Sequence, residues 1–181
     1  MFIFESVKPF NSLKLTEMNK YITFLAALII AFPLNMFAQN YGELQNIKLT
    51  DSLSCAQAQT KVLECCEYLL TNPCIENLPN ANTTSFIIKW MTATPSYTFS
   101  LNRKFYKIIE SNAYLAGRYH AALAKTAIDN NYTKDCPELQ LKAVTLFLSY
   151  CEKEKNYVKI TQKLPTYIEA KNNNQLKELL N

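Results

Sequence analysis

The chain has 181 residues but only two glycines, Gly42 and Gly117. Loops that bind phosphate groups need several closely spaced glycines, because only glycine lets backbone N–H groups approach a phosphate closely. Tight β-hairpin turns also favour glycine, in pairs such as Asn-Gly and Asp-Gly. The sequence therefore excludes the dinucleotide-binding and P-loop patterns, and it favours helices over β-hairpins.

A segment near the start has the three parts of a secretory signal peptide. Residues 18–20 give it a short positive start, and residues 21–34 are apolar except at one threonine. A small residue, Ala38, then precedes the polar Gln39. We therefore expect residues 18–38 to be a cleaved signal peptide, and the mature chain to be exported to the periplasm or secreted.

The residues around this segment suggest how the rest of the chain is organised. Residues 1–17 are expected to be an over-extended gene start. Pro33 and Asn35 interrupt the apolar run below the roughly 20 residues that a membrane span needs. We therefore expect no stable membrane span after cleavage, with an uncleaved anchor as the alternative. Residues 39–50 have no clear period and are an expected N-terminal arm, which leaves residues 51–181 as a single helical domain.

Apolar residues recur at helical spacing throughout residues 51–181. The expected helix starts are Thr50, Asp51 or Ser52 for the first helix, Asn82 or Thr83 for the second, and Asp135 for the fifth. The fifth helix is apolar around most of its circumference, which is typical of a helix in the middle of a domain. No strand-like alternation of convincing length is present. The sequence predicts an all-α fold, a compact bundle of about five to six helices, with a short stack of helical hairpins as the alternative.

All six cysteines lie beyond the expected signal peptide. Because an exported chain meets an oxidising compartment, all six are disulfide candidates: Cys55, Cys65, Cys66, Cys74, Cys136 and Cys151. Cysteines far apart on one helix cannot pair, since a bridge needs Cα atoms within about 7 Å. A fully bridged chain would then join each of the first three cysteines to one of the last three, which leaves several pairings open. Buried free thiols are the alternative.

Most catalytic patterns are missing from the sequence. His120 is the one histidine, and no zinc-peptidase or α/β-hydrolase motif is present. The cysteines lack the spacing of a zinc site, so we expect no metal and no cofactor. The formal net charge is +4, and the densest basic cluster, residues 153–159, alternates with glutamates, so nucleic acid is not an expected partner. The sequence therefore does not indicate an enzyme.

Three short stretches resemble a known family. They are residues 86–99, which read FIIKWMTATPSYTF, residues 150–152, which read YCE, and residues 156–160, which read NYVKI. The chain resembles an uncharacterised family of small exported bacterial helical proteins. This resemblance implies an exported, bacterial and helical protein, and it implies no activity and no site residue.

The longest of these stretches also begins a candidate binding surface. Trp90, Tyr97, Phe99 and the following Arg103 would form an aromatic and cationic surface around the connector at Pro95. Such residues are enriched at the centres of interfaces, although packing in the core is the more ordinary role of aromatic side chains. The sequence therefore favours an exported helical binding or interaction protein of the bacterial envelope, whose partner is a protein or another envelope component. The alternative is an exported cysteine-dependent enzyme or redox protein, with His120 as the base.

Overall fold

Seven α-helices and two 3-10 helices make up the part of the chain that the structure, a computed structural model, describes: residues 41–158 and 163–181. In chain order they are η1 (Glu43–Asn46), α2 (Ser52–Thr71), α3 (Leu78–Ala93), α4 (Arg103–Ile109), α5 (Ala113–Asp129), α6 (Pro137–Cys151), η2 (Glu154–Asn156), α7 (Leu164–Asn172) and α8 (Leu176–Leu180). No strand occurs in these residues, so the predicted all-α fold is confirmed. The expected gene start and signal peptide lie outside the described residues.

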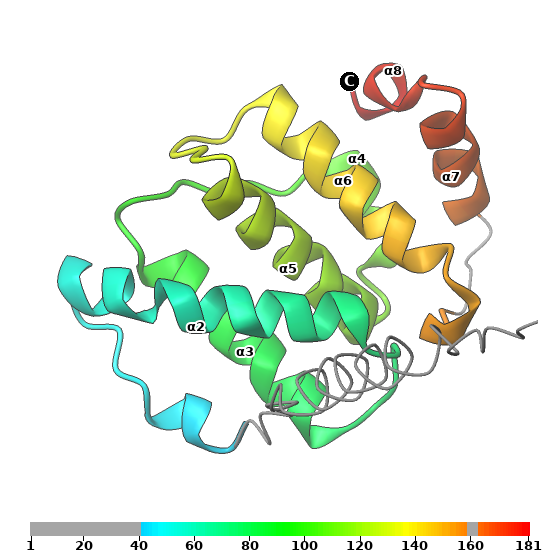
Figure 1. Ribbon diagram of the computed structural model, residues 1–181. Coiled ribbons are helices and arrows are strands. Elements are labelled where there is room, and N and C mark those ends of the chain that lie inside the picture. The colour runs from blue at the N-terminus through cyan, green and yellow to red at the C-terminus, as the bar shows by residue number, and fades with distance from the viewer. Residues whose placement is uncertain (1–40, 159–162) are drawn as a thin grey trace, which may run out of the picture. The chain divides into compact units, whose positions relative to one another are not determined.

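Helix α5 is the hub of this compact bundle. It packs against α2, α3, α4 and α6, and Figure 1 shows it between α2 and α6. Five of its buried positions are alanine, namely Ala116, Ala121, Ala122, Ala124 and Ala127, and these small side chains let its neighbours approach closely. The apolar α6 lies between α5 on one side and α7 and α8 on the other, which agrees with the burial expected for it.

Helix α5 also approaches α3 very closely at Gly117. A Cβ atom at this position would lie 2.5 Å from Thr84 Oγ1 and 2.7 Å from Thr84 Cγ2. Both distances are far below van der Waals contact, so only glycine fits without a shift of the neighbouring helix. Within the described part of the chain, the buried Thr84 hydroxyl has no hydrogen-bond partner. One of the two glycines thus serves helix packing.

The first long helix begins where the sequence indicates. Asp51 is the N-cap of α2, and its Oδ1 accepts a hydrogen bond from the backbone N–H of Ser54 at 2.8 Å. The Asp51 N–H in turn donates to Ser54 Oγ at 3.1 Å. This reciprocal pair is a capping box, which satisfies two backbone donors that would otherwise lack partners.

The expected start of the second helix is wrong. Asn77 caps α3 by accepting the backbone N–H of Asn80 at 2.8 Å, so Asn82 and Thr83 lie buried within the helix rather than at its start. A proline follows in the first turn, where the missing N–H has no helical partner to lose. A segment that resembles a loop because of its prolines is therefore partly helical.

The expected N-cap of α6 is also wrong by one residue. Cys136 occupies the cap position, and its sulfur accepts the Leu139 N–H at 3.4 Å. The carboxylate of Asp135 instead binds the side chains of Ser100 and Gln140. These contacts tie the start of α6 to the connector before α4, which explains why the better capping residue does not cap.

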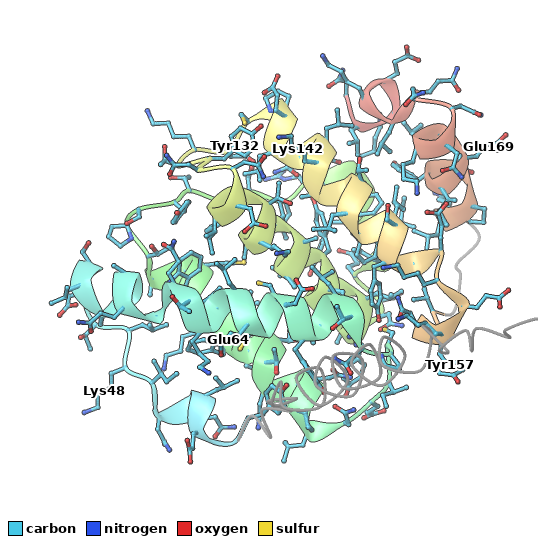
Figure 2. All side chains as sticks on the ribbon, in the orientation of Figure 1. Lys48, Glu64, Tyr132, Lys142, Tyr157 and Glu169 are labelled. Atoms are coloured by element: carbon cyan, nitrogen blue, oxygen red, sulfur yellow. The ribbon has the colours of Figure 1, made fainter. Side chains whose placement is uncertain are left out.

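The turn between α5 and α6 is held by one lysine. Lys142 Nζ donates to Asn130 Oδ1 at 2.6 Å and lies 5.2 Å from the centre of the Tyr132 ring (Figure 2). Contacts between a cation and an aromatic ring at exposed positions contribute about 0.5–1 kcal/mol. Lys142 therefore fixes the turn against the helix that follows it.

A fully buried arginine, Arg118, ties α2, α5 and α6 together. Its Nε donates to the Tyr150 hydroxyl at 2.6 Å, and its Nη2 donates to the Pro73 carbonyl at 2.6 Å. Its Nη1 donates to the Tyr114 carbonyl at 3.1 Å, and the Tyr150 hydroxyl donates to the Asn72 carbonyl at 2.9 Å. All of these acceptors are neutral oxygens. The carbonyls of Asn72 and Pro73 follow α2 directly and lie at the negative end of its dipole, which offsets the positive charge of the buried guanidinium.

Replacing this arginine tests its role. We expect Arg118→Met to lower the free energy of unfolding by about 2–4 kcal/mol, because the Pro73 carbonyl and the Tyr150 hydroxyl lose a buried partner. The matched control is Arg103→Met, at an exposed arginine, which should change the stability by less than about 0.5 kcal/mol. Urea titration of both variants measures the difference. A similar small change for both would contradict the structural role.

The packing at Gly117 gives a second prediction. Gly117→Ala should destabilise the protein by about 1–3 kcal/mol, because the added methyl group overlaps Thr84. Adding Thr84→Ala to the same chain removes both overlapping atoms and should restore most of the loss. Thermal unfolding of the single and double variants measures this recovery. Equal losses in the two variants would mean that the close approach is not the cause.

Candidate functional site

The structure brings three of the four predicted surface residues together, but not as a binding surface. Trp90 is fully buried, and its indole N–H donates to the Cys55 carbonyl on α2 at 2.9 Å. The half-buried rings of Tyr97 and Phe99 pack on it, with ring centres 5.6 Å and 6.1 Å away. The expectation that Trp90 faces a partner is therefore corrected: it joins α3 to α2.

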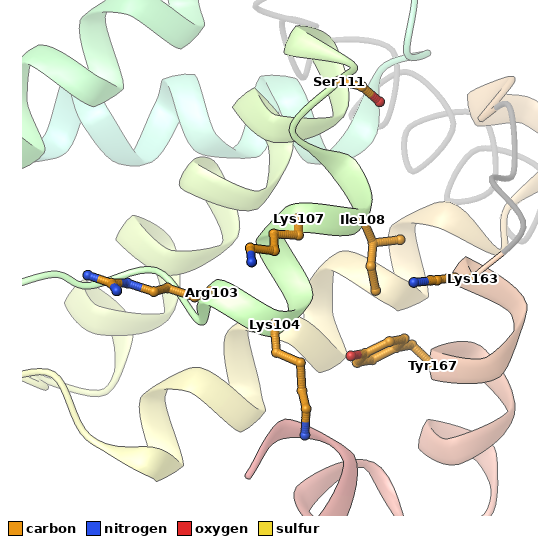
Figure 3. A pocket seen from close by; sticks show the side chains of 7 residues that line it. All are labelled: Arg103, Lys104, Lys107, Ile108, Ser111, Lys163 and Tyr167. Atoms are coloured by element: carbon orange, nitrogen blue, oxygen red, sulfur yellow. The ribbon is translucent and has the colours of Figure 1, made fainter.

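Arg103 lies apart from these aromatic rings and lines an open hollow of about 730 Å³ between α4 and α7. Figure 3 shows that the side chains of this hollow come from two segments, α4 with the turn after it and the start of α7. We call it the cationic hollow, and its lining residues are Arg103, Lys104, Lys107, Ile108, Ser111, Lys163 and Tyr167.

The short helix α4 presents its cations because its other face is anchored. Phe105 and Ile109 are fully buried, so the positively charged residues beside them in the sequence are left at the surface. Asn102 caps α4 by accepting the Phe105 N–H at 3.0 Å, and its Nδ2 donates to the Leu180 carbonyl of α8 at 2.9 Å. The cationic helix is thereby fixed at its start to the last helix.

The other wall of the hollow comes from the start of α7. Lys163 and Tyr167 are four residues apart, a spacing that places side chains on one face of a helix. The Tyr167 ring packs against Phe105, with ring centres 5.1 Å apart. Burial raises the pKa of Tyr167 further above its ordinary value of about 10. Its hydroxyl is therefore protonated at neutral pH and is able to donate a hydrogen bond.

The four cations of the hollow have no acidic partner in the described residues. No carboxylate lines the cavity, and none of the ion pairs found there involves these side chains. Within residues 41–158 and 163–181, Lys104 alone of the four has a polar contact, from its Nζ to the Leu179 carbonyl at 3.3 Å. Like charges focused in a concave surface create a positive potential that attracts anions. The hollow therefore has the chemistry of an anion-binding site.

Sequence reasoning anticipated Arg103 but missed the other cations of this hollow. Lys104 and Lys107 follow it within about one helical turn, and this local clustering was a usable signal. Lys163 and Tyr167 come from a distant part of the chain, and no local pattern connects them to α4. The described residues that line the hollow include no thiol, imidazole or carboxylate.

The cysteines and the histidine lie away from the cationic hollow. All six cysteines are free thiols in the structure, and the disulfides expected from the sequence are not present in it. Burial raises the pKa of the Cys65 and Cys151 thiols to about 12. His120 Nδ1 lies 2.7 Å from the Ala116 carbonyl, and its ring packs edge-on against Tyr106. These surroundings are those of structural side chains.

Metal sites and membrane-spanning helices are both absent from the described residues. No group of three or more His, Cys, Asp or Glu side chains there is arranged to hold a metal ion. None of the helices there has the length and apolar character needed to cross a membrane. The described residues therefore offer no metal site beside the cationic hollow.

Comparison with known proteins gives no family. No family model matches the chain, and neither a curated protein nor a solved structure matches it. The resemblance to small exported bacterial proteins stays a prediction, and the function has to be argued from the geometry alone.

Proposed function

We propose that this chain is an exported binding protein of the bacterial envelope, and that it holds an anionic envelope component in the cationic hollow. The observation that carries the proposal is the set of four cations around one cavity, with no carboxylate among its described lining residues. A ligand that carries phosphate or carboxylate groups satisfies these cations. The location, periplasmic or secreted, rests on the signal peptide expected from the sequence.

The walls of the hollow also favour a ligand with a less polar part. Ile108 and the ring of Tyr167 lie among the cations and offer apolar contact area, and the Tyr167 hydroxyl and Ser111 offer hydrogen bonds. A phosphorylated sugar of an envelope polymer combines an anionic group with a ring that packs on such a wall. This combination supports an envelope glycan or glycolipid over a simple inorganic anion.

The alternative, a cysteine-dependent enzyme, has less support. Thiols act as nucleophiles in the thiolate form, and reactive cysteines have a lowered pKa. Burial instead raises the pKa of Cys65, Cys66, Cys74 and Cys151. The pKa of His120 is lowered by burial, and its Nδ1 is engaged with a backbone carbonyl. No pairing of a thiol with this imidazole supports catalysis.

The binding proposal predicts a loss of affinity on removal of two cations. Lys107→Ala combined with Lys163→Ala should weaken binding to lipopolysaccharide about 5- to 30-fold, because each exposed charge pair contributes up to about 1 kcal/mol. Enzymatic removal of the phosphate groups from the probe should weaken binding to the unmodified protein in the same way. Fluorescence titration at low salt measures both changes, and raising the salt concentration should reduce them.

The matched control removes two exposed lysines that lie outside the hollow. Lys48→Ala with Lys134→Ala changes the net charge by the same amount, so it separates a local effect from a general one. An equal loss of affinity in both double variants would refute the assignment of the site. Binding that is indifferent to the phosphate groups of the probe would refute the class of ligand.

A further inference from the structure

The loop after α2 is fastened to the end of α6 by two independent sets of contacts. The Cys74 backbone N–H donates to the Asn156 carbonyl at 2.8 Å, and Asn156 Nδ2 donates to the Tyr150 carbonyl at 2.7 Å. The Tyr150 hydroxyl reaches back to the Asn72 carbonyl at 2.9 Å. Since Cys151 follows Tyr150 directly, these contacts hold the loop that carries Cys74 against the end of α6 that carries Cys151.

The two thiols share their surroundings as well as their backbone contacts. Burial raises the pKa of both Cys74 and Cys151, and the Arg118 guanidinium beside them opposes this effect in each case. A negative charge on Cys74 also raises the pKa of Cys151, which is consistent with the neighbouring positions that the backbone contacts give the two residues.

Access differs between these two thiols and the three cysteines of α2. Cys74 is half-buried, and Cys151, although buried, forms part of the wall of an open hollow of about 760 Å³ beside Tyr157 and Ile168. The three cysteines of α2 are 1% exposed or less. Cys136 caps the start of α6, about 22 Å from the other end of that helix at 1.5 Å per residue.

We propose that Cys74 and Cys151 form a disulfide when the exported chain meets a dithiol–disulfide oxidoreductase in its oxidised form. The Cys74 thiolate attacks the oxidoreductase disulfide, and one thiolate of that partner leaves. The Cys151 thiolate then attacks the Cys74 sulfur of the mixed disulfide, and the second thiolate leaves. In total the two thiols lose two protons and two electrons, which reduce the partner's disulfide to a dithiol. The structure describes the reduced chain.

This pair differs from the fully bridged pattern considered from the sequence. That pattern joins each cysteine of α2 to one of the last three cysteines, whereas the proposed bridge joins two of the last three, both free thiols in the structure, to each other. The cysteines of α2 then remain buried thiols that fill the core. The bridge closes a long loop that contains α3, α4, α5 and α6, and bridges over long loops restrict the unfolded chain strongly.

Peptide mapping of the full chain, produced by export into an oxidising periplasm, tests the pair. Free thiols are alkylated under denaturing conditions, and a protease that cleaves after glutamate separates the cysteines, because Glu67, Glu76, Glu138 and Glu152 flank them. Mass spectrometry without reductant should find the peptides 68–76 and 139–152 linked, and the other four cysteines alkylated. Recovery of these two peptides as separate alkylated species, or linked to other peptides, would overturn the pair.

Thermal unfolding with and without reductant gives a second readout. Reductant should lower the Tm of the unmodified chain by about 5–15 °C, because the loop-closing bridge is lost. Cys74→Ser and Cys151→Ser should each abolish this reductant-dependent shift, even where they lower the Tm itself. Cys136→Ser is the matched control, because serine is a good N-cap, and it should keep the shift. A reductant-dependent shift that survives Cys74→Ser would also overturn the pair.

Discussion

The buried charge of Arg118 constrains the architecture more than any other single contact. A guanidinium cannot leave water unless oxygen atoms replace its hydration shell, and here those atoms come from three separate segments. Tyr150 completes this shell, because its hydroxyl accepts a hydrogen bond from Arg118 and donates one to the Asn72 carbonyl. The end of α2, the middle of α5 and the end of α6 must therefore meet at one point, and the loop with Cys74 is placed as a consequence.

The crowding around α5 follows from the size of its side chains. Its alanines and Gly117 leave room for α2, α3 and α6 to lie against it at the same time. Large side chains also enter the core from the neighbouring helices, as Trp90 does from α3 and Phe147 from α6. A chain with so few glycines has thus placed one where a methyl group has no room.

Sequence reasoning was sufficient for features that depend on neighbouring residues. The helical periodicity and the Asp51 cap are local, and both are confirmed. The cap at Asn77 was missed because the prolines near it resemble those of a loop, and the cap at Cys136 was missed because Asp135 is engaged by the distant Ser100. The cationic hollow as a whole was not predicted, since its two walls come from α4 and the start of α7, which α5 and α6 separate along the chain. Trp90 was placed at the surface because a pattern of aromatic residues does not reveal which side of a helix faces the core.

Asn102 performs two tasks with the two ends of one amide. Its oxygen caps α4, and its nitrogen holds the Leu180 carbonyl of α8. Deamidation to aspartate would keep the acceptor but remove the donor, so α4 would stay capped while its connection to α8 would depend on the contact of Lys104 with the Leu179 carbonyl. The same reaction would add a negative charge next to Arg103. The ageing of a single side chain would thus loosen one wall of the cationic hollow and weaken its attraction for anions.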